Sequence, residues 1–185
     1  MPSSPISVIP TDTIYGLVGS ALNKKTVEKI YHLRKRNKKK PMIILIDNIK
    51  DLKLFSINIE KPQKKILNKV WPGKVSVILP CPSKKFAYLH RGTKQLAFRL
   101  PKNKWLINFI KQTGPLVAPS ANFEGEPPAR NIEEAKKYFG DKVDLYVSGK
   151  TSKKSSTIIG LNKKGNIELI RPGAVDVRGV EPRGL

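Results

Sequence analysis

Short apolar runs alternate with segments of helical periodicity along the chain. Runs rich in β-branched and aromatic residues predict strands, and apolar residues three or four apart predict amphipathic helices. Strands are predicted at 6–9, 42–46, 74–79, 95–100, 116–118 and 143–147, helices at 23–36, 49–55, 62–70, 105–113 and 131–140, loops at 81–93, 119–128 and 148–155, and a closing hairpin at 157–161 and 167–170. This order indicates an α/β fold with a twisted, mixed, open sheet flanked by helices.

Hydroxyl and carboxylate side chains follow the first predicted strand, in the stretch Pro10-Thr-Asp-Thr-Ile-Tyr-Gly16. Pro10 is expected to end the hydrogen bonding of that strand, and Gly16 to let the chain turn or approach a ligand. Thr13 and its neighbours can then point into a cleft. The alternative, an Asx or Ser/Thr turn that caps the next element, explains the same residues equally well.

The length and the ends of the chain favour one domain in a reducing compartment. At 185 residues, we expect a single domain over 1–175, with a mobile tail over 176–185 that has no apolar pattern. The first residues do not resemble a secretory signal, and the apolar runs are too short to cross a bilayer. Cys81, the single cysteine, cannot form an intramolecular disulfide. We therefore expect a cytoplasmic protein without a membrane partner.

The chain carries a large excess of positive charge. Its 36 Lys and Arg residues against 14 Asp and Glu residues give a formal net charge of +22, which favours polyanionic partners. Any RNA binding through such scattered lysines is predicted to depend steeply on salt. A general compositional bias toward lysine is the alternative. Six of these cations lie in seven residues, 34–40, where a helix is predicted to meet a strand and cations can surround phosphates.

Several common catalytic motifs are excluded. Gly149-Lys150-Thr151 imitates the end of a phosphate-binding P-loop, but Asp144 stands where the leading glycine belongs. The chain has no Gly-x-Ser-x-Gly motif and no histidine beside a plausible nucleophile, and its histidines and cysteine lack the spacing of a zinc site, so no metal ligands are predicted.

The polar inventory that remains suits anion binding. Strand alternation sets Arg99 opposite Leu96 and Phe98, so Arg99 need not lie in the core. Hydroxyls, an amide and guanidinium groups can hold an anion and stabilise charge at phosphorus without a general base. The residues concerned are Thr13, Ser120, Asn122, Ser156, Arg36, Arg99 and Arg171.

The ordered set of motifs resembles the YrdC/Sua5 family of threonylcarbamoyl-AMP synthases, and the resemblance covers nearly the whole chain. It implies a YrdC/RibB-like fold and a minimal, single-domain YrdC-type member. Any one motif is weak, but seven in the family's order are specific. The motifs are Pro10-Thr-Asp-Thr-Ile-Tyr-Gly16, Arg34-Lys-Arg36 to Lys40-Pro41, Trp71-Pro-Gly73, Phe98-Arg-Leu-Pro101, Pro119-Ser-Ala-Asn122, Ser156-Thr-Ile-Ile159 and Ile170-Arg-Pro-Gly173.

The resemblance implies a nucleotidyltransferase that makes L-threonylcarbamoyladenylate from L-threonine, bicarbonate and ATP, with release of pyrophosphate. Mg²⁺ would arrive with ATP, and the product would feed N6-threonylcarbamoyladenosine formation at position 37 of tRNA by the downstream threonylcarbamoyl-transfer machinery. By the same resemblance, the residues divide into a threonine group (Thr13, Arg99 and Ser156), an ATP group (Arg36, Lys40, Ser120, Asn122 and Arg171) and a catalytic pair (Arg34 and Arg36).

Three positions depart from the family pattern. Arg34 replaces the usual Lys, Asn37 a common Pro, and Gly160 a frequent Asp. We expect Arg34 still to present a charge to the phosphates, so that activity survives and Arg34→Lys changes turnover only modestly. The alternatives are a YrdC-like protein that binds tRNA or double-stranded RNA without synthesis, and a carbamoyl-transfer domain like those of hydrogenase-maturation proteins.

Overall fold

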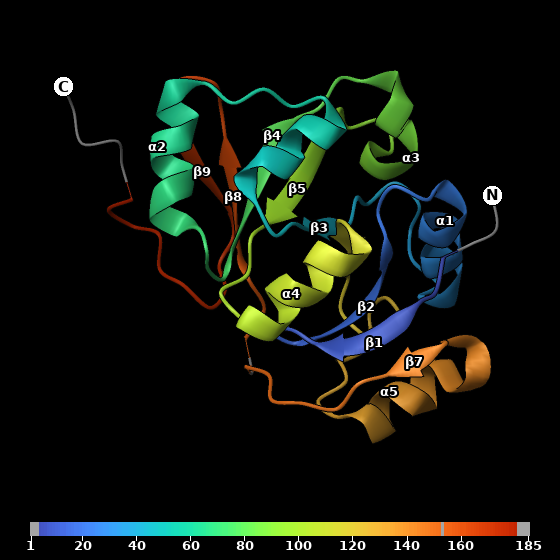
Figure 1. Cartoon of the computed structure of the whole chain (residues 1–185). Helices are drawn as coiled ribbons and strands as arrows, with labels where there is room; N and C mark the ends of the chain where they lie inside the picture. The colour runs from blue at the N-terminus through green and yellow to red at the C-terminus, as the bar shows by residue number, and fades with distance from the viewer. Residues whose placement is uncertain (1–3, 153, 181–185) are drawn as a thin grey trace.

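A mixed nine-stranded sheet forms the centre of the described molecule (Figure 1). The structure is a computed structural model and describes residues 4–152 and 154–180. The strand order is β7-β1-β2-β6-β3-β5-β4-β8-β9. The strands are β1 (Ser7–Pro10), β2 (Tyr15–Ser20), β3 (Ile43–Leu45), β4 (Val75–Pro80), β5 (Gln95–Arg99), β6 (Leu116–Val117), β7 (Leu145–Tyr146), β8 (Thr157–Leu161) and β9 (Ile167–Arg171). The pairs β1–β7, β3–β5 and β4–β8 are parallel and the other neighbours antiparallel, which confirms the predicted mixed sheet.

Asparagine side chains begin three of the α-helices. Asn23, Asn103 and Asn131 each accept a hydrogen bond from a backbone N–H three residues on, which confirms the starts predicted at Asn23 and Asn131. The helices are α1 (Lys24–Leu33), α2 (Lys61–Val70), α3 (Ala87–His90), α4 (Lys104–Thr113) and α5 (Ile132–Phe139), with 3₁₀ turns η1 (Ile49–Phe55), η2 (Lys84–Phe86) and η3 (Gly140–Lys142). The helix predicted to reach residue 36 ends at Leu33, so Arg34 is its C-terminal cap.

The part of the sheet formed by β1, β2, β6 and β3 is buried on both faces. Ile9, Val18 and Leu45 pack on one face with Leu106 and Ile110 of α4. Alternate residues of the same strands join the main core with α1 on the other face. Near-continuous apolar runs are the sequence consequence of such two-sided burial.

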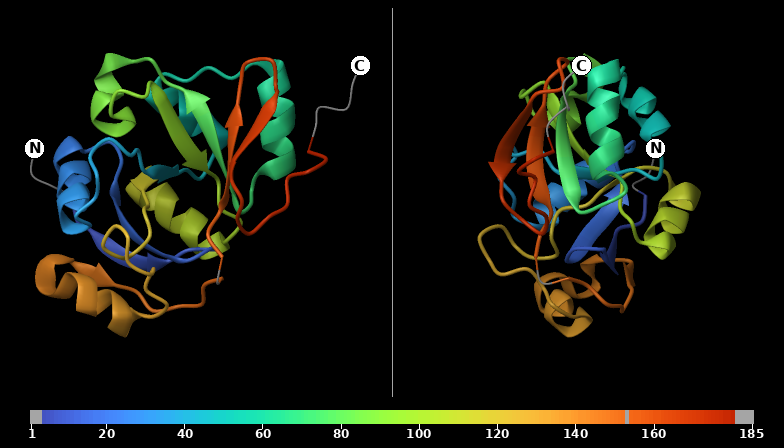
Figure 2. Two further views of the ribbon diagram at one scale, coloured as in Figure 1. Left: turned by 180° about the vertical axis from the view of Figure 1, so that it is seen from behind. Right: turned by 90° about the vertical axis from the view of Figure 1, so that its left-hand side faces the viewer.

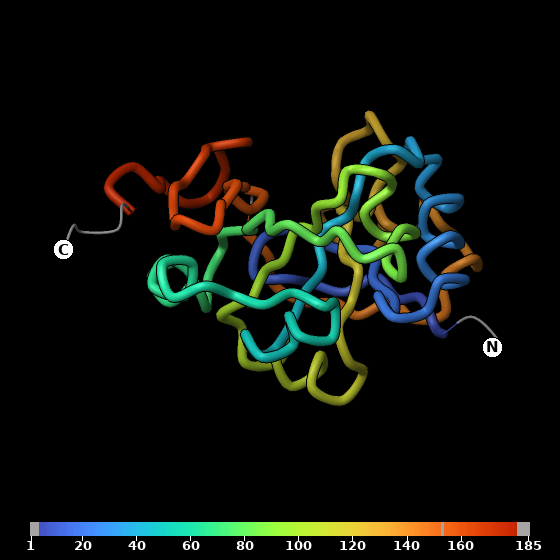
Figure 3. The backbone as a smooth tube through the Cα atoms, turned by 90° about the horizontal axis from the view of Figure 1, so that it is seen from above, coloured from blue at the N-terminus to red at the C-terminus, as the bar shows by residue number. Residues whose placement is uncertain are grey.

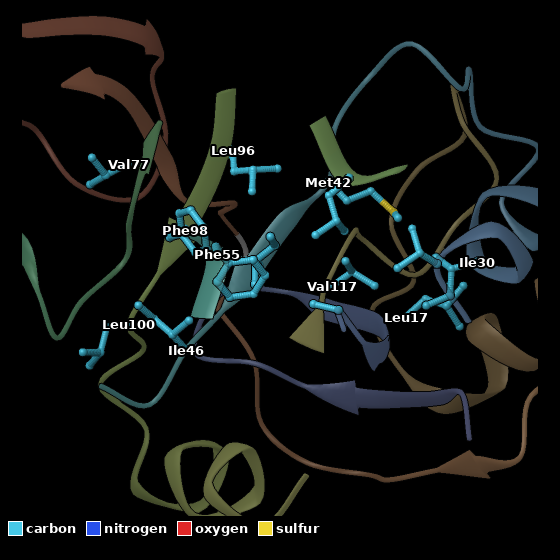
Figure 4. Close-up of a cluster of buried hydrophobic side chains, with 14 of the residues drawn as sticks. Leu17, Ile30, Met42, Ile46, Phe55, Val77, Leu96, Phe98, Leu100 and Val117 are labelled. Atoms are coloured by element: carbon cyan, nitrogen blue, oxygen red, sulfur yellow. The ribbon is translucent and has the colours of Figure 1, made fainter. Parts of the chain in front are cut away.

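The other part, formed by β5, β4 and β8, is covered on one face by η1 and α2. The Phe55 ring of η1 lies 5.1 Å from the Phe98 ring of β5, and Val77 of β4 belongs to the same core (Figure 4). The right-hand view of Figure 2 shows α2 and α4 on the same side of the molecule, with β8 and β9 on the other side. The opposite face of these strands lines the cavity described below.

The strand β2 was missed by the sequence prediction. Of the two alternatives expected for Gly16, the turn is wrong, whereas Gly16 does line the cavity described below. The turn falls at residues 11–14, and Gly16 pairs within β2 with Ile9 of β1. Pro10 is the last residue of β1 and lies opposite Tyr15, in agreement with the expectation that it ends the hydrogen bonding of that strand. Gly19 serves close packing instead of a turn, because a Cβ there would lie 2.5 Å from the Thr26 methyl group of α1.

Smaller differences concern loops and ends. The loop predicted at 81–93 contains η2 and α3. Figure 3 shows the β8–β9 hairpin at the opposite end of the molecule from α1 and α5. Residues 1–3, used above to argue against a secretory signal, and residues 181–185 of the predicted tail lie outside the described residues; Val177, within that tail, is buried. Among the described helices, none is long and apolar enough to span a bilayer.

Candidate functional site

A cavity of about 450 Å³ opens where five distant segments of the chain meet. These are the turn before β2 with the start of β2, the segment from Arg34 to β3, the antiparallel pair β4–β5, the loop after β6, and the β8–β9 hairpin with the residues just before it. Within the described residues, the charged side chains of the lining all belong to arginines: Arg34, Arg36, Arg99 and Arg171. The hydroxyls of Thr11, Thr13, Ser120 and Ser156 also line it. Such a lining favours an anionic ligand.

Arg99 lines the cavity and is only 4% exposed. Its Nη1 donates a hydrogen bond to Thr13 Oγ1 (2.9 Å), and its Nη2 lies 3.2 Å from Asp12 Oδ1 in an ion pair. Burial lowers the pKa of Arg99, and the Asp12 carboxylate opposes this shift. Arg99 Nε has no hydrogen-bond partner among the described residues. The donor capacity of this buried nitrogen is therefore unused within the described chain.

Arg99 is buried but lies outside the hydrophobic core, as the sequence analysis expected. The predicted alternation is right, because Phe98 packs in the core while Ala97 and Arg99 line the cavity. The Arg99 face of β5 is enclosed by the 11–14 turn instead of facing solvent. Asp12 supplies the counter-charge, a role that the sequence analysis missed although it singled out the motif containing it.

Ser156 is held from two sides. Its hydroxyl lies 2.9 Å from Ser76 Oγ of β4, which is fully buried, and its carbonyl accepts a hydrogen bond from Arg171 Nη2 (2.8 Å). Gly173 allows this arrangement, because a Cβ there would lie 2.5 Å from backbone atoms of Ser156 and Thr157. Ser76 is a second site residue that the sequence analysis did not identify.

Arg34 is a clamp between the end of α1 and the loop after β6. It is 3% exposed; Nε donates to the Asn122 carbonyl (3.1 Å), and Nη2 donates to Asn122 Oδ1 (2.9 Å) and Ser120 Oγ (3.1 Å). Nη1 has no partner among the described residues. Burial, with Arg36 nearby, lowers the pKa of Arg34 to about 10, so it remains charged at neutral pH.

The ATP group expected from the resemblance is only partly in the cavity lining. Arg36, Ser120 and Arg171 line it, whereas Lys40 and Asn122 do not. The Asn122 amide donates to the carbonyls of Phe123 and Glu126, so both of its ends are used within the chain. The threonine group and Arg34 all line the cavity. Asn122 is thus placed to hold the loop and Arg34.

Two arginines that line the same cavity each keep one guanidinium nitrogen without a hydrogen-bond partner among the described residues, Nε of Arg99 and Nη1 of Arg34. Buried donors without partners are uncommon, and a ligand would satisfy them. No carboxylate, histidine or cysteine side chain belongs to the lining in the described part of the chain. The arrangement can hold and align anionic groups and stabilise developing negative charge, with little capacity for acid–base chemistry.

Fold and site together define an α/β protein with an arginine-lined pocket on the face of β4, β5 and β8 that lies opposite η1 and α2. The family model Sua5_yciO_yrdC, described as "Telomere recombination", matches residues 3–173. The chain therefore belongs to the Sua5/YciO/YrdC family, which confirms the resemblance seen in the motifs.

Relatives in this family cover the same region. The chain is 27% identical over 175 residues to the threonylcarbamoyl-AMP synthase of Pyrococcus abyssi and 28% identical over 179 residues to that of Bacillus subtilis. These matches cover 93% and 95% of the chain but 51% and 52% of the relatives, so it spans about half their length. The crystal structure of P. abyssi Sua5 complexed with L-threonine superposes with a TM-score of 0.86 at 26% identity, covering 95% of this chain and 52% of that one. This similarity confirms the predicted fold class.

Proposed function

We propose that this chain is a threonylcarbamoyl-AMP synthase, which condenses L-threonine, bicarbonate and ATP into L-threonylcarbamoyladenylate and pyrophosphate. The observation that carries the proposal is that one cavity contains two groups of residues that can each bind an anion. Arg99 lies with Thr13 and Ser156 at one end, and Arg34 lies with Ser120 at the other. The names of the relatives and the L-threonine complex of P. abyssi Sua5 support it.

At the Arg99 end of the cavity, the free Nε of Arg99 would bind the threonine carboxylate. Asp12 and Thr13 occupy the other two nitrogens, so they fix the plane of the guanidinium before the ligand arrives. The Ser156 hydroxyl, oriented by Ser76, would contact the polar groups of threonine. In this proposal these residues bind and orient one substrate.

At the Arg34 end of the cavity, the free Nη1 of Arg34 would bind the nucleotide phosphates together with Arg36 and Arg171. The threonine amine adds to bicarbonate with loss of water to form a carbamate. A carbamate oxygen then bonds to the α-phosphorus while the bond to pyrophosphate breaks. The arginines align the two anions and neutralise charge that develops on the phosphate oxygens, so no side-chain general base is required.

The charged side chains of the lining are guanidinium groups, which are phosphate ligands and not metal ligands. We therefore propose that Mg²⁺ enters as the complex with ATP and is held by its phosphates. The product would serve N6-threonylcarbamoyladenosine formation at position 37 of tRNA, through the downstream threonylcarbamoyl-transfer machinery.

The direct test is threonine-dependent release of pyrophosphate from ATP in the presence of bicarbonate and Mg²⁺, with the adenylate identified by mass spectrometry. Omitting threonine is the chemical control. Arg130→Ala is the protein control, because that side chain is 87% exposed on the surface. Pyrophosphate release that does not require threonine, or no release at all, would reject the synthase and favour the RNA-binding alternative.

A further inference from the structure

The carboxylate of Glu124 contacts three donor groups of one neighbouring segment, residues 36–40. Its carboxylate accepts hydrogen bonds from the Asn37 backbone N–H and from Lys40 Nζ (2.8 Å), and Arg36 Nη1 lies 4.0 Å from it. These contacts lower the pKa of Glu124, with the Asn37 N–H as the largest cause. The Glu124 side chain is 22% exposed. One internal carboxylate thus occupies a position surrounded by two cations and an amide.

Two cations and a backbone N–H form a binding site that suits a phosphate oxygen as well as a carboxylate oxygen. Arg36 also lines the cavity, so the position that the Glu124 carboxylate occupies adjoins the cavity. Arg36 is held in place by the carbonyls of Lys40 and Pro41, to which it donates hydrogen bonds of 3.2 and 2.9 Å. Arg36 is therefore preorganised independently of Glu124.

We propose that the Asn37 N–H, Arg36 and Lys40 form a subsite for a phosphate of the ATP tail, which Glu124 fills in the nucleotide-free protein and ATP must take over. This inference rests on the proposed function for the identity of the ligand. It adds the backbone N–H of Asn37 as a binding group, and Glu124 as a residue that limits the affinity for ATP. A proline at position 37 could not supply the amide donor.

The Glu124 side chain can leave this position without moving its loop. The Glu124 backbone N–H donates to the Arg34 carbonyl (2.9 Å), and Lys35 Nζ lies 4.4 Å from the Phe123 ring centroid. Both contacts are independent of the Glu124 carboxylate. Because ion pairs near the surface change an equilibrium constant by no more than about fivefold, exchange for a multiply charged phosphate is feasible.

The test compares Glu124→Gln with the parent chain. Glutamine keeps the size of the side chain and one acceptor oxygen but removes the charge that competes with phosphate. Glu126→Gln is the matched control, since Glu126 is an exposed carboxylate in the same loop and its loss changes the net charge equally. Binding of ATP, of inorganic tripolyphosphate and of L-threonine is measured for all three proteins by calorimetry at constant salt.

We expect Glu124→Gln to bind both ATP and tripolyphosphate about threefold to fivefold more tightly than the parent, with Glu126→Gln within about twofold of the parent. Threonine affinity should not change. Tripolyphosphate affinity that is equal in the parent and in Glu124→Gln, or weaker in Glu124→Gln, overturns the subsite. If no protein binds ATP while tripolyphosphate still distinguishes Glu124→Gln, the proposed function fails and the phosphate subsite stands.

Discussion

Replacing Arg34 with lysine tests whether this residue acts as a three-bond clamp. The guanidinium donates hydrogen bonds to two acceptors on Asn122 and one on Ser120. These residues lie 86 to 88 positions away in the sequence. A lysine ammonium is a single point of charge on a flexible stem, and it cannot match a fork of donors. We expect it to retain about one of the three hydrogen bonds.

The magnitude follows from the two bonds lost. Each hydrogen bond contributes about 1–1.5 kcal/mol to the free energy of unfolding, because water forms hydrogen bonds to the same groups in the unfolded chain. Arg34→Lys should therefore lower the free energy of unfolding by about 2–3 kcal/mol. The loop that carries Ser120 should also loosen, which weakens ATP binding. This geometry replaces the expectation from sequence that Arg34→Lys changes turnover only modestly.

Denaturant unfolding followed by circular dichroism measures the effect, with Arg130→Lys as control. Arg130 pairs only at the surface with Glu134, so its replacement should cost less than about 0.5 kcal/mol. If Arg34→Lys is within about 0.5 kcal/mol of the parent and equal to the control, the clamp makes no net contribution and the reasoning is refuted.

Three further outcomes are expected. Arg99→Ala should weaken threonine binding about tenfold to a hundredfold with little change for ATP, because one charge-assisted contact is lost; unchanged threonine affinity would remove Arg99 from the site. Gly173→Ala should destabilise the protein by about 1–3 kcal/mol, because its Cβ would meet backbone atoms 2.5 Å away; a parental unfolding midpoint would contradict this. The lowered pKa of Glu124 means that its charged form stabilises the fold above its unfolded-state pKa and that this contribution is lost as the pH falls through the lower folded value. Glu124→Gln should therefore melt below the parent at pH 7, and the difference should shrink steadily as the pH falls below the ordinary pKa of a glutamate; a difference that does not shrink with falling pH would contradict the assignment.

The sequence alone determined the elements whose apolar period is local. The spacing of Val27, Ile30 and Tyr31 predicted α1, and the asparagines at positions 23 and 131 predicted two helix starts that the structure confirms. The family motifs contain all four arginines that line the cavity, because each motif is contiguous in the chain. These signals lie within a few residues of one another and need no knowledge of the fold.

Only the tertiary structure decided how distant groups meet. Glycines made β2 resemble a turn, and its pairing with β1 and β6 becomes visible only when both neighbours are in place. Alternation set the direction of Arg99, but its burial depends on Asp12 from another segment. The partnerships of Arg34 with Asn122 and of Lys40 with Glu124 join residues more than 80 positions apart. Local periodicity does not encode such pairings, because they depend on the register of the whole sheet.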